Sequence, residues 1–196
     1  TGVITFKSAP DFETKLGGTG NDSNDYVIEV TATDGGSLTD TQTITISVTN
    51  ANEAPVITTT SFGSIAENQT AVGSLAVTDD AGDSITFTVT GGVDSDKFAV
   101  SGSTLAFSGF TPNFESPTGG SGNDSNTYEV QITATDGGSL TDVETVSVTV
   151  INVNEQPVIT SSATFSQNEN TSTAIAAADV TPTDPDGAGS FTHSIV

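Results

Sequence analysis

The ten residues TATDGGSLTD occur twice in this chain, at Thr31–Asp40 and again 102 positions later at Thr133–Asp142. Around them, Tyr26–Ile57 aligns without gaps on Tyr128–Ile159, with 19 of 32 positions identical. A self-similarity at a fixed offset indicates tandem structural repeats. The offset is close to the length of one two-sheet β-sandwich domain, so the sequence predicts a tandem array of such domains.

Alternating apolar and polar side chains identify the strands of each repeat. The period of two is clearest over Tyr128–Ala134, Thr43–Thr49, Thr145–Ile151 and Ile85–Val89, and it is typical of strands that bury one face. Glycine-rich turns separate these segments, as at Asp34–Gly36. Because no stretch has helical periodicity, we expect an all-β fold of immunoglobulin-like Greek-key β-sandwiches.

Two proline-containing segments mark the expected domain boundaries, Asn50–Pro55 and its copy Asn152–Pro157. Proline cannot continue the hydrogen-bond ladder of a central strand, so these segments are predicted to be linkers. One complete repeat is then expected over residues 53–154. Residues 1–52 would hold the late strands of a preceding repeat, and residues 155–196 the early strands of a following repeat.

Composition excludes several classes of function. The chain has 25 acidic residues against 3 lysines and a formal charge of −22, so it cannot form the cationic surface that binds nucleic acid or an anionic membrane. It has no cysteine for a disulfide or a thiol nucleophile, and no apolar run long enough to insert into a membrane. His193 is its only histidine, and no serine-nucleophile motif accompanies it, so we do not expect an enzyme.

Acidic and amide side chains gather at corresponding ends of the repeats. Near the first junction they are Asp11, Glu13, Asn50, Asn52, Glu53, Asp79, Asp80, Asp83 and Asp136. Near the second junction they are Glu67, Glu115, Asn152, Asn154, Glu155, Asp184 and Asp186. Calcium takes six to eight oxygen ligands in a flexible shell, which such side chains supply. The alternative is that these are solvated loop residues, but this does not explain why they recur at equivalent positions.

Five short motifs follow one another through the repeat: Ala66–Asn68, Asp79–Asp83, Asn113–Glu115, Ala134–Asp136 and Asn152–Pro157. In this order they resemble the xEN, DxD, DRE, AxD and DxNDNxP motifs of cadherin-type tandem repeats. The same motifs recur at the equivalent positions of the neighbouring repeats. The chain therefore resembles cadherin-like repeats over essentially its whole length, in particular those of large bacterial surface and secreted proteins.

In cadherin repeats, calcium ions at each junction take ligands from both neighbouring domains and from the linker. When these ligand roles are transferred to the matching positions of this chain, the resemblance implies the following ligands at the first junction: Asp11, Glu13, Asn50, Asn52, Glu53, Asp79 and Asp136. At the second junction it implies Glu67, Glu115, Asn152, Asn154, Glu155, Asp184 and Asp186. Asn50 and Asn152 replace the first acid of the family's linker, and Asn113 replaces an aspartate. One or two ions per junction are therefore expected in place of the family's three.

Two glycine-rich loops, Gly17–Asp22 and Gly119–Asp124, match the GGxGxD start of a calcium-binding nonapeptide. Asn24 and Asn126 stand where such a repeat has its packing aliphatic residue, and each loop occurs singly. Plain polar hairpin loops are therefore expected.

These features predict an extracellular or cell-surface structural protein, in which calcium-stiffened tandem repeats form a rod, fibre or filament that serves adhesion. Two alternatives remain, a module that recognises a glycan or a protein and a passive spacer of a secreted enzyme. The expected partners are neighbouring repeats of the same polypeptide, or identical chains in a head-to-tail array. Each half repeat leaves a core face open, and Ser190–Val196 aligns with the strand-forming Ser84–Thr90.

Overall fold

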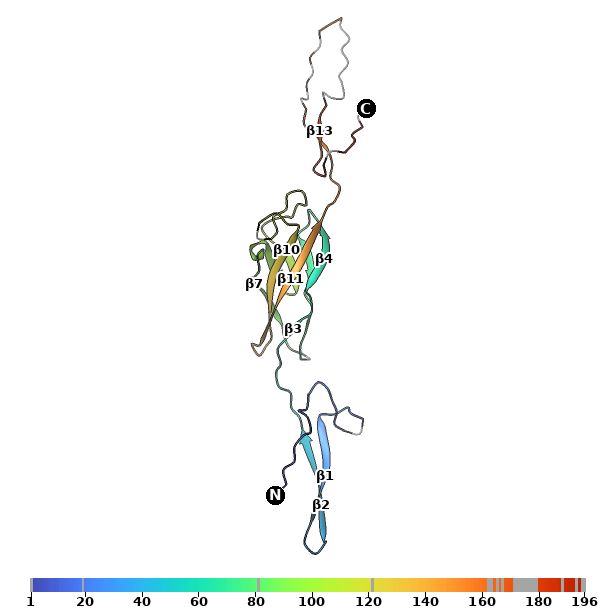
Figure 1. Cartoon of the computed structure of the whole chain (residues 1–196), viewed down its shortest axis with the longest axis vertical. Helices are drawn as coiled ribbons and strands as arrows, with labels where there is room; N and C mark the ends of the chain where they lie inside the picture. The colour runs from blue at the N-terminus through green and yellow to red at the C-terminus, as the bar shows by residue number, and fades with distance from the viewer. Residues whose placement is uncertain are drawn as a thin grey trace.

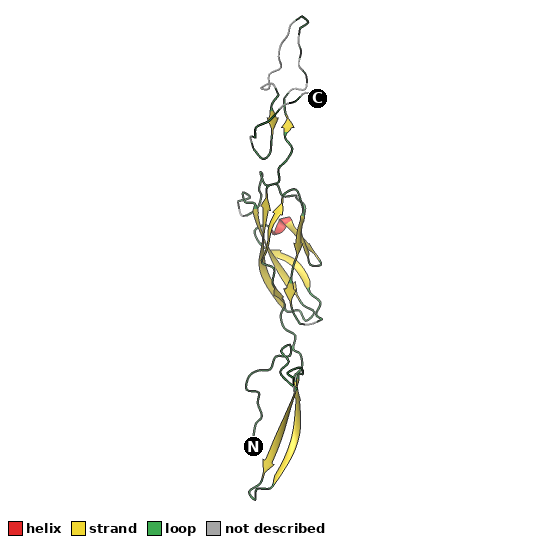
Figure 2. Ribbon diagram, turned by 90° about the vertical axis from the view of Figure 1, so that its right-hand side faces the viewer, coloured by secondary structure: helices red, strands yellow, loops and turns green. Residues whose placement is uncertain are grey.

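The structure is a computed structural model that describes residues 2–18, 20–80, 82–120, 122–161, 164, 166, 168–170, 180–187, 189–192 and 194. Over these residues the chain is elongated, with β1 and β2 at one end and β13 at the other (Figure 1). Its regular elements are strands and one short 3-10 turn (Figure 2), which confirms the predicted all-β class. The elements are β1 (Asp25–Thr33), β2 (Thr39–Ser47), β3 (Val56–Ile57), β4 (Ser61–Ala66), β5 (Ala71–Ser74), β6 (Val77–Thr78), β7 (Thr86–Gly91), η1 (Ser95–Lys97), β8 (Phe98–Ser101), β9 (Thr104–Phe107), β10 (Thr127–Thr135), β11 (Thr141–Ile151), β12 (Val158–Ile159) and β13 (Pro182–Thr183).

Two sheets form a sandwich in the middle of the chain. One has the strand order β4-β11-β10-β7 and the other β5-β9-β8, and β3 pairs with β6. β10 is antiparallel to β11, whereas β4 runs parallel to β11 along its other edge. Because β4 and β11 run in the same direction, Ala66 lies beside Ile151 at their last residues. The segments that follow these two strands therefore leave the sandwich at the same end.

The apolar face of each strand points into the space between the sheets. Tyr128, Val130 and Ile132 of β10 are all 0% exposed, which confirms the orientation that the alternation predicted. Phe98 and Phe107 of the second sheet stack with ring centroids 4.6 Å apart, and Tyr128 meets Phe107 edge-on at 5.1 Å. Burying a large apolar side chain contributes roughly 1.5–3 kcal/mol, so this core holds the sandwich together.

The hairpin of β1 and β2 has the same antiparallel pairing as β10 and β11, but no second sheet covers it within the described residues. Val30 is 37% exposed, whereas its counterpart Ile132 is 0% exposed. Likewise, Ile159 in β12 is 62% exposed, whereas its counterpart Ile57 in β3 is 5% exposed. The same residue pattern therefore leaves an apolar face open in the first and last parts of the chain.

The glycine-rich loops before β1 and β10 are hairpin loops, as expected. Gly17 forms a β-bridge with Ser23, and Gly119 forms one with Ser125. In the second loop Asn123 has a φ of 52°, a left-handed conformation that asparagine tolerates better than most residues. Each loop thus closes on itself just before the long strand that follows.

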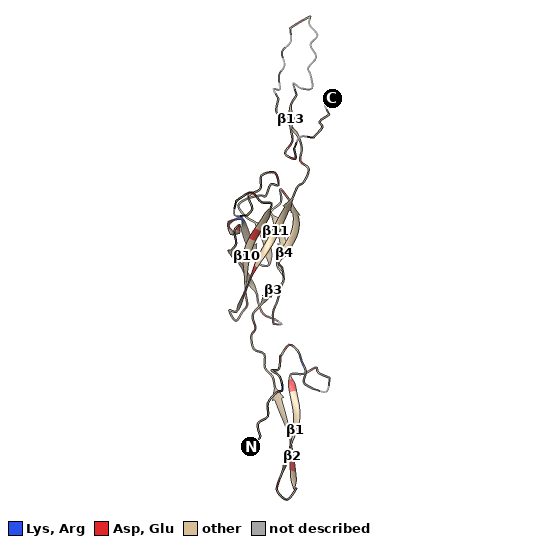
Figure 3. Cartoon of the chain, in the orientation of Figure 1, with Lys and Arg blue, Asp and Glu red and all other residues tan. Residues whose placement is uncertain are grey.

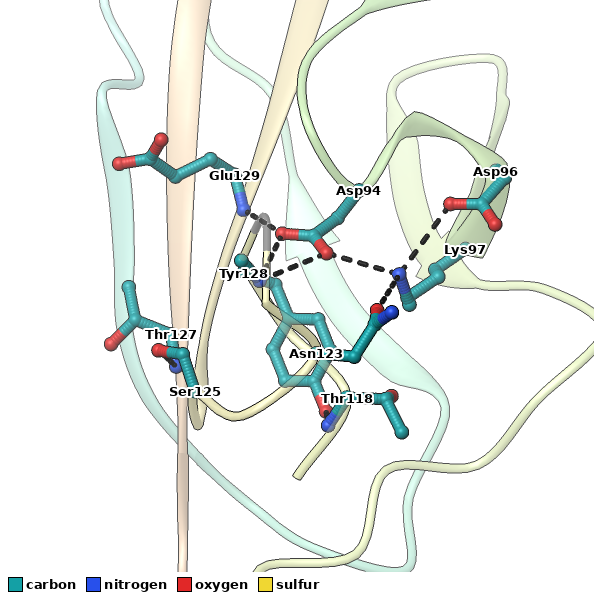
Figure 4. Close-up of polar contacts among 10 residues, drawn as sticks. Asp94, Asp96, Lys97, Thr118, Asn123, Ser125, Thr127, Tyr128 and Glu129 are labelled. Atoms are coloured by element: carbon teal, nitrogen blue, oxygen red, sulfur yellow. Dashed lines mark hydrogen bonds and ion pairs between the residues drawn. The ribbon is translucent and has the colours of Figure 1, made fainter. Parts of the chain in front are cut away.

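A buried carboxylate, that of Asp94, anchors the second of these loops (Figure 4). It accepts hydrogen bonds from the backbone amides of Gly120, at 3.1 Å to each oxygen, and Glu129, at 2.9 Å. Lys97 Nζ lies 3.1 Å from Asp94 Oδ1. Burial alone would lower the pKa of Lys97, but the bond to Asp94 and the charges of Asp94 and Asp96 raise it. The ion pair therefore joins η1 to the loop and to β10.

No helix within the described residues is long and apolar enough to cross a membrane. Two expectations fall at least partly on positions that the structure does not describe. His193 lies outside the described residues, as do positions 195 and 196. Residues 190–192 and 194 are described and are not in a strand, so the strand expected over Ser190–Val196 is wrong for these residues.

Candidate metal centres

Among the residues that the structure describes, carboxylates from segments far apart in the sequence come together in three clusters. In each cluster every residue offers one oxygen, and these oxygens lie within 4.8 Å of one another. Acidic residues occur along the whole chain (Figure 3), so this proximity distinguishes the clustered ones. Cluster one is Glu13, Glu53 and Asp80; cluster two is Asp79, Asp83 and Asp136; cluster three is Glu67, Glu115 and Glu155.

Cluster three is built around Glu67, which directly follows β4 and is 2% exposed. Its Oε1 accepts a hydrogen bond from the amide of Val153, just past β11, and its Oε2 accepts one from the amide of Phe114, both at 2.8 Å. The parallel pairing of β4 and β11 brings these segments together. Glu67 therefore ties the linker to the segment that carries Glu115.

The other two carboxylates of cluster three are held by asparagine side chains. Asn152 Nδ2 donates to Glu115 Oε1, and Asn68 Nδ2 donates to Glu155 Oε1, both at 2.8 Å. Glu115 Oε2 is buried and has no hydrogen-bond partner among the described residues. Within the described part of the chain, one buried oxygen of this cluster thus has no protein donor.

Electrostatic repulsion is evident at Glu115. Burial, followed by the charges of Glu67, Glu155 and Asp186, raises the pKa of its carboxyl. Neither a lysine nor an arginine forms an ion pair in the cluster within the described residues. The cluster is therefore a concentration of negative charge without a protein counter-charge.

The first junction is arranged around the linker in a similar way. Asn52 Nδ2 donates to Asp136 Oδ2 of cluster two at 2.6 Å. Asp80 Oδ2 of cluster one accepts from Asn50 Nδ2 and from the backbone amide of Glu53, both at 3.4 Å. Both carboxylate oxygens of Asp79 are buried without a hydrogen-bond partner among the described residues. The first junction thus also contains carboxylate oxygens that lack a donor.

The pKa values of these acids shift in both directions. Burial, then the charges of Asp80 and Glu53, raises the pKa of Glu13. Burial, then the charges of Asp79, Asp80 and Asp136, raises the pKa of Asp83. Burial alone would also raise the pKa of Asp136, but the hydrogen bonds from Asn52 and from the backbone at residues 138–140 lower it. Asp83 and Asp136 face each other in cluster two, so the hydrogen bonds to Asp136 decide the opposite direction of its pKa shift.

Lowering the pH from neutral towards the ordinary pKa values of the carboxyl groups is expected to raise the melting temperature of the metal-free chain. Because Glu13, Asp83 and Glu115 have raised pKa values, the folded chain binds more protons than the unfolded chain above their ordinary values of 4.5 for Glu and 3.8 for Asp. Stability therefore falls as the pH rises through this window. Asp11 and Asp136, whose pKa values are lowered, lose their stabilisation only below 3.8.

Circular-dichroism melting curves in EDTA check this pH dependence. A melting temperature that falls steadily on acidification over the same range would contradict it.

Seven of the fourteen residues expected as metal ligands lie in the clusters: Glu13, Glu53, Asp79, Asp136, Glu67, Glu115 and Glu155. Asn50, Asn52 and Asn152 donate to cluster carboxylates. Asn154 donates to the carbonyl of Glu155 at 3.2 Å, and Asp186 accepts from its amide at 2.6 Å. These residues border cluster three, and their metal-binding role remains a prediction.

Asp11 and Asp184 lie outside the three clusters. Asp11 accepts hydrogen bonds from the amides of Glu13 and Thr14, and the bond from Thr14 is the main cause of its lowered pKa. Asp184 accepts from the amide of Asp186 at 3.0 Å. Both carboxylates cap their own turns, a common alternative use of aspartate in loops.

Asp80 and Asp83 belong to the clusters although the expected ligand set omits them. Asp80 accepts a hydrogen bond from the backbone amide of Glu53, as Asp186 does from the backbone amide of Glu155. Asp80 follows Asp79 directly, whereas the corresponding pair at the second junction is separated by one residue. This difference in spacing hides the equivalence in the sequence.

The clusters offer only oxygen ligands, partly buried and held by backbone and amide donors. Carboxylate oxygens are the ligands of hard cations such as Ca²⁺ and Mg²⁺. The buried oxygens of Asp79 and Glu115 that lack a donor fit such a cation, because a positive charge would satisfy them. The arrangement is therefore suited to binding divalent metal ions.

No protein-family model matches the chain, and neither does any curated protein sequence. Solved structures do match. A structure of extracellular cadherin domains 1–4 of protocadherin gamma B7 matches with a TM-score of 0.52 and 22% identity, over 74% of this chain and 37% of that chain. The extracellular domain of protocadherin gamma B4 matches with a TM-score of 0.50 and 24% identity, over 79% of this chain and 24% of that chain. This chain thus spans well under half of either structure, and its fold is that of cadherin domains.

Proposed function

We propose that each of the three clusters binds a calcium ion at a junction between cadherin-like repeats. For clusters two and three, the observation that carries this proposal is that buried oxygens of Asp79 and Glu115 have no donor among the described residues, and for all three clusters it is the close approach of like charges. A buried acceptor without a partner costs free energy, and so does the repulsion between neighbouring carboxylates. A bound divalent cation would offset both costs.

Calcium fits these ligands better than magnesium does. Magnesium demands a near-ideal octahedral shell and keeps several of its waters, whereas calcium accepts an irregular shell of carboxylate and carbonyl oxygens. The clusters draw their oxygens from loops and linkers that are separated in the sequence, such as Glu13, Glu53 and Asp80. An irregular ligand set of this kind favours calcium.

The position of cluster one supports a stiffening role. Glu13 belongs to the segment before β1, Glu53 to the linker, and Asp80 to the loop that follows β6 of the sandwich. An ion held by all three would connect the first part of the chain to the middle part across the linker. Its binding would therefore restrict bending at the junction.

The biological role that follows is that of an extracellular or cell-surface structural protein in adhesion. We infer three repeats, partial over residues 1–52, complete over 53–154 and partial over 155–196. The cadherin fold, the elongated shape (Figure 1) and the acidic junctions support a calcium-stiffened rod or filament.

The open apolar face of β1 and β2 indicates the kind of partner. In the central sandwich, the counterpart of this face is buried against the second sheet, as the 0% exposure of Ile132 shows. We expect the face that includes Val30 to be covered by the corresponding strands of the same repeat. These would come from the adjoining polypeptide or from an identical chain in a head-to-tail array.

Calcium is expected to raise the melting temperature and the protease resistance of the chain, because a ligand that binds only the folded state stabilises it by mass action. Isothermal titration calorimetry would measure the binding, and melting curves in calcium and in EDTA would measure the stabilisation. No binding heat at millimolar calcium, together with identical melting curves in calcium and EDTA, would contradict the proposal.

Glu115→Ala and Glu129→Ala form a matched pair for this experiment. Both remove one negative charge, but Glu115 lies in cluster three, whereas the Glu129 side chain is exposed on β10 and points away from Asp94 (Figure 4). Only Glu115→Ala is expected to weaken calcium binding. Equal effects of the two changes would show that overall charge, and not the cluster, governs the response.

A further inference from the structure

Two asparagines at equivalent positions make the same contact in both junction regions. Asn126 Nδ2 donates to the carbonyl oxygen of Phe114 at 2.9 Å, and Asn24 Nδ2 donates to that of Phe12 at 3.0 Å. In each case the carbonyl lies 12 residues upstream, on the far side of the glycine-rich loop. The residue after each phenylalanine is a cluster glutamate, Glu115 in one region and Glu13 in the other.

The orientation of both asparagine side chains is determined by this contact. The Oδ1 atoms of Asn24 and Asn126 are buried and have no partner among the described residues. Exchanging Oδ1 and Nδ2 would place an oxygen against the carbonyl oxygen of the phenylalanine, so Nδ2 must face the carbonyl. Each side chain thus makes this one bond while leaving a buried oxygen unsatisfied, which is costly.

The second loop is closed by backbone hydrogen bonds that do not involve Asn126. Gly119 and Ser125 exchange backbone hydrogen bonds, with Gly119 N donating to Ser125 O at 2.9 Å and Ser125 N donating to Gly119 O at 3.0 Å. Asp94 separately anchors the amide of Gly120. Loop closure therefore does not account for the asparagine contact.

What Asn126 does hold is the backbone next to Glu115. The amide of Phe114 donates to Glu67 Oε2 at 2.8 Å, and its carbonyl accepts from Asn126. Phe114 is thus fixed on both its amide and its carbonyl side. Because the Phe114 carbonyl belongs to the peptide that joins it to Glu115, this contact sets the direction in which the Glu115 side chain leaves the backbone.

We propose that Asn126 and Asn24 are positioning residues for the junction metal sites. By holding the carbonyl that precedes Glu115 or Glu13, each keeps the following carboxylate pointing into its cluster. This inference rests on the proposed function, since it concerns the same calcium sites. Residues that orient metal ligands without touching the metal commonly affect metal affinity roughly 10–100-fold.

The test is Asn126→Leu in the full chain. Leucine has a similar volume and removes the donor together with the unsatisfied Oδ1, so the loss of that buried oxygen partly offsets the cost of leaving the Phe114 carbonyl without its donor. The melting temperature in EDTA is therefore expected to stay close to that of the unsubstituted chain. Calcium affinity at the second junction, measured by calorimetry, is expected to fall roughly 10-fold or more.

Asn24→Leu is the matched variant, because it should weaken binding at the first junction and leave the second unchanged. Together the two variants assign the calorimetric binding classes to the junctions. Amide hydrogen exchange at residues 113–116 in EDTA gives a readout that does not need calcium, and it is expected to be faster in Asn126→Leu.

The possible outcomes separate this inference from the proposed function. If the unsubstituted chain binds no calcium, both the proposed function and the positioning role of Asn126 are wrong. If it binds calcium and Asn126→Leu binds it with unchanged affinity, only the positioning role is wrong. A melting temperature lowered equally in EDTA and in calcium, without a change in affinity, would assign Asn126 to the fold alone and overturn the inference as well.

Discussion

Replacing Glu67 by alanine is expected to destabilise the central sandwich and to abolish tight calcium binding at the second junction. Glu67 is 2% exposed, and its carboxylate accepts hydrogen bonds from the backbone amides of Phe114 and Val153. A buried donor left without an acceptor costs about 1–3 kcal/mol, and two donors lose their acceptor here. The same change removes the central carboxylate of cluster three.

The decrease in melting temperature that Glu67→Ala causes should depend on whether calcium is present. In EDTA the loss of two hydrogen bonds is partly offset, because removing one carboxylate relieves the repulsion on Glu115 and Glu155. In calcium this relief is absent and a ligand is lost, so the decrease in melting temperature should be larger. Melting curves in both conditions measure the difference.

Glu67→Gln is the control for this prediction. Glutamine keeps one oxygen that can accept a hydrogen bond from one of the two backbone amides. Its NH₂ group then faces the other amide, which is also a donor, and the negative charge is lost. Its melting temperature should fall between those of Glu67→Ala and the unsubstituted chain, with calcium binding weakened. Glu67→Ala melting like the unsubstituted chain in calcium would contradict the assigned role of Glu67.

The strands could be predicted from the sequence because each of them needs only a local pattern. Alternation over residues 128–134 and 145–151 predicted β10 and β11, and the structure buries their apolar faces as expected. Burial in the first hairpin could not be predicted in this way. Val30 and Ile132 occupy equivalent positions in nearly the same local sequence, but their exposure depends on whether a second sheet faces them.

The carboxylate clusters were predictable as a group of acids, but not residue by residue. Recurrence at the repeat ends identified Glu13, Glu67 and Glu115, because both copies place acids there. It could not show that Asp11 caps its own turn or that Asp80 enters a cluster. Those outcomes depend on which backbone amides lie within hydrogen-bond distance, and the sequence does not specify this.

Asp94 carried no signal in the sequence at all. It lies between β7 and η1, and no second copy of this segment occurs in the chain for comparison. An aspartate two residues after a glycine pair, as in Gly91–Asp94, is typical of an exposed turn. Its burial follows from the nearby amides of Gly120 and Glu129 and from Lys97, all of which come close only in the folded chain.

Asp94→Ala is therefore expected to be among the most destabilising single substitutions in the central sandwich. The Asp94 side chain is fully buried, and its removal leaves two backbone amides without an acceptor and Lys97 Nζ without its buried counter-charge. A buried donor left without an acceptor costs about 1–3 kcal/mol, and the amides of Gly120 and Glu129 both lose theirs here. That is a large share of the roughly 5–15 kcal/mol that stabilises a typical domain, so the urea midpoint in EDTA should fall steeply.

Lys97→Met separates the two roles of Asp94. Methionine removes the cation but leaves the carboxylate bonded to the amides of Gly120 and Glu129, and the Lys97 side chain, at 14% exposure, lies closer to solvent than Asp94 does. If the amide bonds dominate, as the geometry indicates, Lys97→Met should lower the urea midpoint much less than Asp94→Ala. Equal losses would mean that the ion pair dominates, whereas a midpoint for Asp94→Ala close to that of the unsubstituted chain would show that the loop holds without its anchor.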